Sequence, residues 1–147
     1  MIRVLIRTAD FDAGKEIALL SASGGGAVAS FVGQVRGDDA VALLSLEHYP
    51  AMTQTVLEKI AEEAVSRWSL RAATIVHRVG DIPVGAQIMF CGAAADHRAD
   101  ALAACTFLID RLKTDAPFWK KEIAADGSEQ WVEQREADLA RGESWDR

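Results

Sequence analysis

Residues 50–68 most tightly constrain the fold of this chain, because their apolar side chains recur at helical spacing. Side chains three and four positions apart share one face of an α-helix, and the apolar ones here are Met52, Val56, Leu57, Ile60, Ala64, Val65 and Trp68. Pro50 suits the first turn, which needs no backbone N–H donor. The opposite face carries Glu58, Lys59, Glu62 and Glu63. The sequence therefore predicts an amphipathic helix that covers an apolar surface built by other segments.

Segments with strand-like composition lie on both sides of this helix. They are 2–7, 27–36, 41–49, 72–79, 87–95, 118–123 and 130–133. Further helices are expected at 12–23 and 98–114. Gly24-Gly25-Gly26 would end the first and Pro117 the second. The triple glycine lacks the flanking pattern of a phosphate-binding loop, so we interpret it as a helix stop.

The connections between these segments favour hairpins. Gly37-Asp38-Asp39 predicts a turn that pairs 27–36 with 41–49, and Asp126-Gly127 predicts one that pairs 118–123 with 130–133. Residues 80–85, rich in Gly and Pro, predict a bend or excursion. The order of elements predicts an α+β fold with a mostly antiparallel sheet and about three helices.

Length and charge limit what the chain can do. Its 147 residues fit one domain, 1–147, in which the charged tail 134–147 is expected to be mobile. No apolar run approaches the roughly 20 residues of a membrane span and no signal peptide precedes the first strand, so a cytoplasmic location is expected. The net charge of −6 opposes binding to nucleic acid or to an anionic membrane. An anionic ligand should therefore be small and bound locally.

Two lysines near the end of the 98–114 helix could carry chemistry. The predicted apolar stripe of that helix comprises Leu102, Cys105, Leu108, Ile109 and Leu112, with Asp110 and Arg111 opposite. Lys113 falls about 20° from Leu102, at the edge of the stripe. After the rigid Pro117-Phe118-Trp119 turn come Lys120 and Lys121. Two ammonium groups held close lower each other's pKa, so that one can act as a base or nucleophile.

Each of these lysines also has a plainer interpretation. Lys113 could be a surface lysine whose alkyl chain covers apolar residues, and Lys120-Lys121 could be an exposed pair that protects a strand edge. His97-Arg98 stands where a strand meets a helix N-terminus, a place that favours an anion, and Arg36 ends a strand. His48 and His77 lack metal-ligand spacing and are expected to be structural. Cys91 and Cys105 lie among apolar neighbours and are expected to be buried thiols.

The motifs together resemble the large subunit of molybdopterin synthase. They are Phe31-Val32-Gly33-Gln34-Val35-Arg36, Leu46-Glu47-His48-Tyr49-Pro50-Ala51-Met52, His77-Arg78-Val79-Gly80, His97-Arg98, Leu112-Lys113-Thr114-Asp115-Ala116-Pro117-Phe118-Trp119-Lys120-Lys121-Glu122 and Trp131-Val132-Glu133. The resemblance extends over about residues 26–135, and the Lys-Thr-x-x-Pro-Phe-Trp-Lys block is its most specific part.

The resemblance implies an α/β-hammerhead fold and a homodimer within a heterotetramer. A ubiquitin-like sulfur-carrier small subunit would insert a Gly-Gly tail that ends in a thiocarboxylate. Two sulfurs would pass to cyclic pyranopterin monophosphate and form the dithiolene used in molybdenum cofactor biosynthesis. By the same resemblance Lys113 and Lys120 are the catalytic lysines. The substrate-binding residues would be Gln34, Val35, Arg36, His97, Arg98, Lys121, Glu122 and Arg135, and neither a metal nor a cofactor is implied.

One departure and two competing hypotheses accompany this resemblance. Only residues 37–40 separate the Val35-Arg36 element from the next strand, whereas relatives often have a longer loop, so the pocket could be more open. A lysine-dependent lyase that forms a Schiff base would also use a lysine of lowered pKa beside a phosphate. A non-enzymatic module could use the same cations to hold a ubiquitin-like tail.

Overall fold

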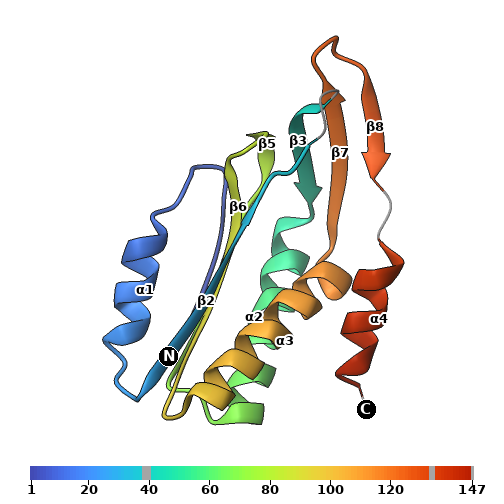
Figure 1. The fold of residues 1–147 in the computed structure, drawn as a ribbon. Coiled ribbons are helices and arrows are strands. Elements are labelled where there is room, and N and C mark those ends of the chain that lie inside the picture. Colours follow the sequence, from blue (N-terminus) through green and yellow to red (C-terminus); the bar gives the residue numbers. More distant parts are fainter. Residues whose placement is uncertain (38–40, 133–134, 147) are drawn as a thin grey trace.

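The computed structural model describes residues 1–37, 41–132 and 135–146. Over these residues the chain forms two four-stranded sheets and four helices (Figure 1). The first sheet has the order β1-β4-β6-β2, with β1 at Ile2–Arg7, β4 at Ala72–Arg78, β6 at Gln87–Ala95 and β2 at Ala27–Gln34. Only β1 and β4 pair in parallel in it. The predicted α+β class and the mostly antiparallel pairing are confirmed.

The second sheet is antiparallel throughout its described strands. Its order is β5-β3-β7-β8, with β5 at Gly80–Pro83, β3 at Val41–His48, β7 at Phe118–Ala124 and β8 at Glu129–Val132. The hairpin predicted around Asp126-Gly127 is confirmed as β7 and β8. The excursion predicted at residues 80–85 contains β5, which pairs with β3 and so ties the second sheet to the connection between β4 and β6.

Helices cover both faces of the first sheet (Figure 1). Helix α1, Ala13–Ser21, lies on one face, and α2, Pro50–Trp68, and α3, Arg98–Asp115, lie on the other. Side chains alternate along a strand, so β4 is buried on both faces. Its Val76 packs in the cluster that holds Leu20 of α1, and its Ile75 packs with Leu57 of α2. The amphipathic helix predicted at 50–68 is confirmed, although Met52 is exposed.

The hairpin predicted between 27–36 and 41–49 is wrong. Strand β2 pairs with β6 in the first sheet, while β3 pairs with β5 and β7 in the second. The pairing of β2 with the buried, apolar strand β6 outweighs the local turn signal. Val35 also stays bonded to the first sheet, because its N–H donates to the carbonyl of Ala86. The predicted turn residues Asp38 and Asp39, and the strand end predicted at Glu133, lie outside the described residues.

A fourth helix, α4 at Glu136–Ser144, lies within the segment for which the sequence predicted only a charged tail. The indole of Trp145, just after it, packs edge to face on Trp68 and Phe107 at 5.6 and 5.5 Å between ring centroids. The same indole donates a 2.7 Å hydrogen bond to Asp110. Asp110, which the helical stripe placed on the polar side of α3, is therefore buried, while Leu102 is exposed.

Among the described residues, no helix is both long enough and apolar enough to cross a bilayer.

Candidate active site

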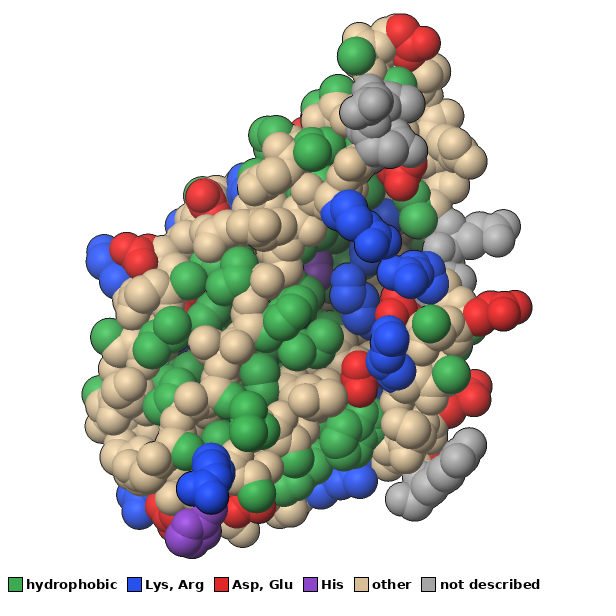
Figure 2. Space-filling view, viewed as in Figure 1, with side chains coloured by type: hydrophobic (Ala, Val, Ile, Leu, Met, Phe, Trp, Pro, Cys, Tyr) green, Lys and Arg blue, Asp and Glu red, His purple; other side chains and the backbone are tan. Residues whose placement is uncertain are grey.

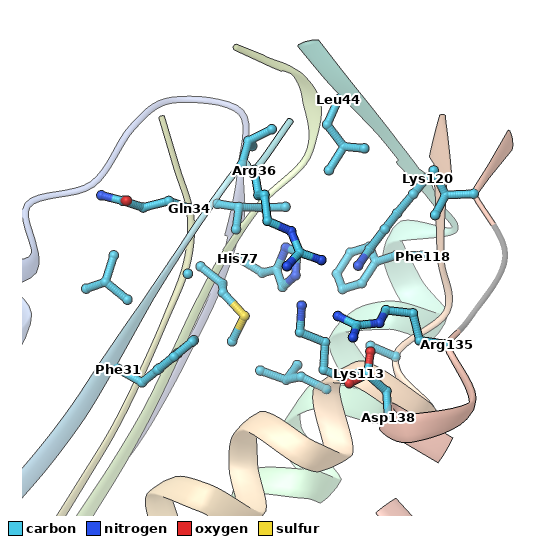
Figure 3. Close-up of a pocket in the computed structure, with 18 of the residues that line it drawn as sticks. Phe31, Gln34, Arg36, Leu44, His77, Lys113, Phe118, Lys120, Arg135 and Asp138 are labelled. Carbon is cyan, nitrogen blue, oxygen red and sulfur yellow. The ribbon is translucent and has the colours of Figure 1, made fainter. Parts of the chain in front are cut away.

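A pocket of about 510 Å³ lies where the end of β2, the C-terminal end of α3, strand β7 and the start of α4 meet (Figure 3). Phe31, Met89, Leu112 and Phe118 contribute apolar lining. Figure 2 shows Lys and Arg side chains gathered beside a broad apolar area on this face of the molecule. The pocket has the size of small-molecule sites. It combines apolar walls with a concentration of cations.

Lys113 reaches this pocket from the last turn of α3. The helix ends there because Pro117 disfavours helical backbone at Ala116, which is extended with φ −69° and ψ 129°. Strand β7 then starts at Phe118 and runs back along the pocket. The connection therefore brings Lys113 and Lys120 to one cavity, and their ammonium groups point into it (Figure 3).

Alternation along β7 decides which of its side chains face the pocket. Phe118, Lys120 and Glu122 line it, as expected for every second residue of a strand. Lys121 is on the other face, where its Nζ lies 3.2 Å from a carboxylate oxygen of Glu129 and 5.1 Å from the Trp131 ring centroid. One copy of the chain does not bring Lys121 to the pocket of Lys120, because adjacent strand residues point to opposite faces. The expected part of Lys121 in substrate binding stays a prediction.

Burial gives Lys120 an unusual protonation equilibrium. Desolvation, and after it the charge of Lys113, lowers the pKa of Lys120 to about 8, while the carboxylate of Asp138 acts in the opposite direction. A fraction of Lys120 is therefore neutral near physiological pH. Such an amine can accept a proton or attack an electrophile.

His77 lines the same pocket although the sequence indicated only a structural role. Its ring stacks on Phe118 at 4.1 Å between centroids, and its Nδ1 lies 2.8 Å from the carbonyl oxygen of Arg78. A carbonyl can only accept, so Nδ1 carries the proton. Burial lowers the pKa of His77 to about 3. The hydrogen bond to Arg78 acts in the opposite direction, and the charges of Lys120 and Lys113 lower the pKa further. The pocket thus contains a neutral imidazole, which its apolar strand position could have suggested.

Further charged side chains complete the pocket. Arg36 and Arg135 add guanidinium groups, while Glu122 and Asp138 add carboxylates. In Figure 3 the Arg36 guanidinium points toward the two lysines, whereas the amide of Gln34 points away from them. Val35 is buried at the wall. Among the predicted substrate-binding residues, Gln34, Val35, Arg36, Glu122 and Arg135 therefore share the pocket with both lysines.

His97 and Arg98 are at the opposite end of α3. His97 is the N-cap residue and Arg98 the first residue of the helix, so they lie roughly 22 Å along its axis from Lys113. Both are exposed, and neither is among the described residues that line the pocket. One copy of the chain does not bring them to Lys113. Their expected part in the site stays a prediction that requires a second copy.

Both cysteines are buried in the main core, as expected from the sequence. Burial raises the pKa of Cys91 well above its usual value, and burial raises the pKa of Cys105 to about 11. Neither thiol is therefore a ready nucleophile. Within the described residues no group of His, Cys, Asp and Glu is arranged to hold a metal ion.

The charge and burial of the pocket residues define a class of protein. A cavity with four Lys and Arg side chains and a lysine of lowered pKa, in a chain of net charge −6, is the site of an enzyme for a small anionic substrate.

Comparison with known proteins then gives the family. Residues 6–115 match the model of the MoaE protein family, and the chain belongs to that family. It is 43% identical to the molybdopterin synthase catalytic subunit of Vibrio cholerae, with 98% of each chain covered.

Solved structures agree with this assignment. The molybdopterin biosynthesis MoaE protein from Burkholderia ambifaria superposes with a TM-score of 0.85 at 49% identity, covering 100% of this chain and 99% of that one. A chain of molybdopterin synthase from Staphylococcus aureus gives a TM-score of 0.78 at 27% identity, over 88% of this chain and 96% of that one. The fold implied by the sequence resemblance is therefore confirmed.

Proposed function

We propose that this chain is the catalytic subunit of a cytoplasmic molybdopterin synthase. It transfers two sulfurs from the thiocarboxylated C-terminus of a ubiquitin-like small subunit to cyclic pyranopterin monophosphate, and so forms the molybdopterin dithiolene. The observation that carries the proposal is the position of Lys113 and Lys120 in one cation-lined pocket, with the pKa of Lys120 lowered to about 8 by burial and by Lys113. Membership of the MoaE family supplies the reaction for which such a pocket is suited.

The charges of the pocket suit the anions of this reaction. A phosphate monoester and a thiocarboxylate each need charge-assisted donors. Arg36 and Arg135 supply guanidinium groups within this chain. His97 and Arg98 of the second subunit of a homodimer complete the phosphate-binding site. The apolar lining from Phe31 and Phe118 suits the flat pterin ring.

The two lysines divide the work of the transfer. The thiocarboxylate sulfur bonds to the pterin and so forms a thioester with the small subunit. Water then cleaves this thioester, which leaves the sulfur on the pterin and a carboxylate on the small subunit. The Lys113 ammonium stabilises the negative charge that develops on the thioester carbonyl oxygen as water adds. Lys120, whose pKa burial lowers, moves the proton that accompanies addition of sulfur to the pterin or opening of its ring. The sulfur comes from the small subunit, so the buried Cys91 and Cys105 have no part in the transfer.

Reconstitution tests this function. The purified chain is mixed with a thiocarboxylated small subunit and cyclic pyranopterin monophosphate, and the dithiolene product is measured. Dithiolene formation supports the proposal. If no product forms and borohydride instead traps a covalent adduct between the pterin and a lysine, the Schiff-base lyase is the correct function. Unchanged turnover after loss of both Lys113 and Lys120 would favour the non-enzymatic module.

A further inference from the structure

Helix α4 is fastened to the end of α3 at several points. Besides the Trp145 contacts, Arg111 forms a 2.7 Å ion pair with Asp146, and Arg67 donates a 3.1 Å hydrogen bond to the carbonyl of Trp145. Gly142 is buried against Thr114, and a Cβ added at Gly142 would lie 2.5 Å from the Thr114 methyl group. The N-terminal part of α4 is therefore held at a fixed place beside the pocket.

Asp138, in the first turn of this helix, faces the pocket. Its side chain is 18% exposed, and it accepts a 3.3 Å hydrogen bond from Arg141. In Figure 3 its carboxylate points toward the side chains of Lys113 and Arg135. Glu136, on the same turn, is exposed and is not one of the pocket residues. The two acids of this turn thus have different surroundings.

The charges around Lys120 are predominantly positive. The ionisable groups that face it come from every element around the pocket: Lys113 of α3, Arg36 after β2, His77 of β4, Glu122 of β7, and Arg135 and Asp138 at the start of α4. His48 of β3 also lies near this group, with its ring centroid 6.0 Å from that of Phe118. Because like charges at this density repel, a carboxylate among them has a clear electrostatic part to play.

We propose that Asp138 is a positioning residue of this site: its carboxylate, delivered by the docked helix α4, offsets the repulsion among Lys113, Lys120 and Arg135 and keeps their side chains directed into the pocket. The catalytic consequence rests on the proposed function, whereas the electrostatic consequence does not. Asp138 raises the pKa of Lys120, against burial and Lys113, which lower it. Removing the carboxylate should therefore lower the pKa of Lys120 further.

Competitive labelling tests this without substrate. Trace acetic anhydride reacts with neutral amines, so the labelling of Lys120, read by mass spectrometry across a pH series, gives its titration midpoint in the full chain. Asp138→Asn should move the midpoint to lower pH by about half a unit or more. Asp138→Glu, which keeps the charge, should restore it, and Glu136→Gln, which removes one charge from the same turn, should leave it in place.

An unchanged midpoint in Asp138→Asn, with α4 still docked as judged by unchanged proteolysis near residue 140, would overturn the proposal. If α4 undocks in Asp138→Asn, the Asp138→Glu variant distinguishes an electrostatic role from a purely structural one. A purely structural aspartate would not tolerate the longer side chain, so the midpoint of Lys120 would change in Asp138→Glu. A wild-type midpoint in that variant supports the electrostatic role. In the reconstituted complex the inflection of the pH–rate profile should move in the same direction as the labelling midpoint. A shifted midpoint in a chain whose wild type forms no dithiolene would count against the proposed function and in favour of the Asp138 assignment.

Discussion

Lys113 and Lys120 come from different elements, the last turn of α3 and strand β7, yet their side chains enter one pocket. Burial of Lys120 lowers its pKa to about 8, and the charge of Lys113 adds to that effect. The Pro117 turn between them sets this arrangement because it ends the helix and starts the strand.

The first prediction concerns the thiols. Replacing Cys91 and Cys105 together by Ala should leave dithiolene formation close to the wild-type rate, because both are buried and their pKa values are raised by that burial. The loss of core packing should lower the free energy of unfolding by about 1–2 kcal/mol. Rates at a temperature well below the melting point separate the two effects. A persulfide detected on either cysteine during turnover would contradict the prediction.

The second prediction concerns acid stability. Burial lowers the pKa of His77 to about 3, whereas an unfolded histidine titrates near 6.5. Between these values the unfolded chain binds the proton and the folded chain does not. The contribution of His77 to the free energy of unfolding is therefore fully present above about pH 6.5. It is lost as the pH falls toward 3, at up to about 1.4 kcal/mol per pH unit. His77→Gln should flatten the fall of the melting temperature over this range. The exposed His97→Gln should not.

The third prediction concerns the docking of α4. Trp145→Ala removes the ring contacts with Trp68 and Phe107 and the hydrogen bond to Asp110. We expect a loss of about 2 kcal/mol of stability, faster proteolysis near residue 140, and slower sulfur transfer because Asp138 and Arg135 leave the pocket. Leu139→Ala, at a side chain 38% exposed on the same helix, is the control. Equal proteolysis of the two variants would show that Trp145 does not hold the helix.

The fourth prediction concerns the second subunit. Dimers that combine one Arg98→Ala chain with one Lys113→Ala chain contain one intact site if Arg98 acts across the dimer. They should then regain about half of the wild-type activity, while each homodimeric variant stays impaired. Differently tagged chains allow the mixed dimer to be purified. If the mixed dimer is as inactive as the two parents, Arg98 serves the pocket of its own chain. Wild-type activity in the Arg98→Ala homodimer would mean that Arg98 serves neither pocket.

Patterns that depend on local spacing were predictable from the sequence. The helix at 50–68 follows from its apolar stripe, and the convergence of Lys113 and Lys120 follows from a helix end and a proline turn. The side-chain alternation that separates Lys120 from Lys121 was also available in the sequence, although the family resemblance alone grouped them.

Features that depend on distant partners were not predictable. Strands β2 and β3 are adjacent in the chain but belong to different sheets, because β2 pairs with β6 and β3 pairs with β7, both of them distant in sequence. Helix α4 has few apolar residues, and its docking depends on the ring of Trp145 meeting Trp68 and Phe107. Asp138 joined the site only through that docking.

The catalytic role of Lys113 is tested most directly by single-turnover dithiolene formation with the Lys113→Ala chain. Alanine keeps the helix, so melting temperature and affinity for the small subunit should stay within the limits of ordinary surface variants. Loss of a positioned cation should slow the reaction by at least about 100-fold, or about 2.7 kcal/mol. Lys59→Ala, on the exposed face of α2, should react at the wild-type rate. A wild-type rate in Lys113→Ala would contradict the role assigned to Lys113 and leave it a surface lysine.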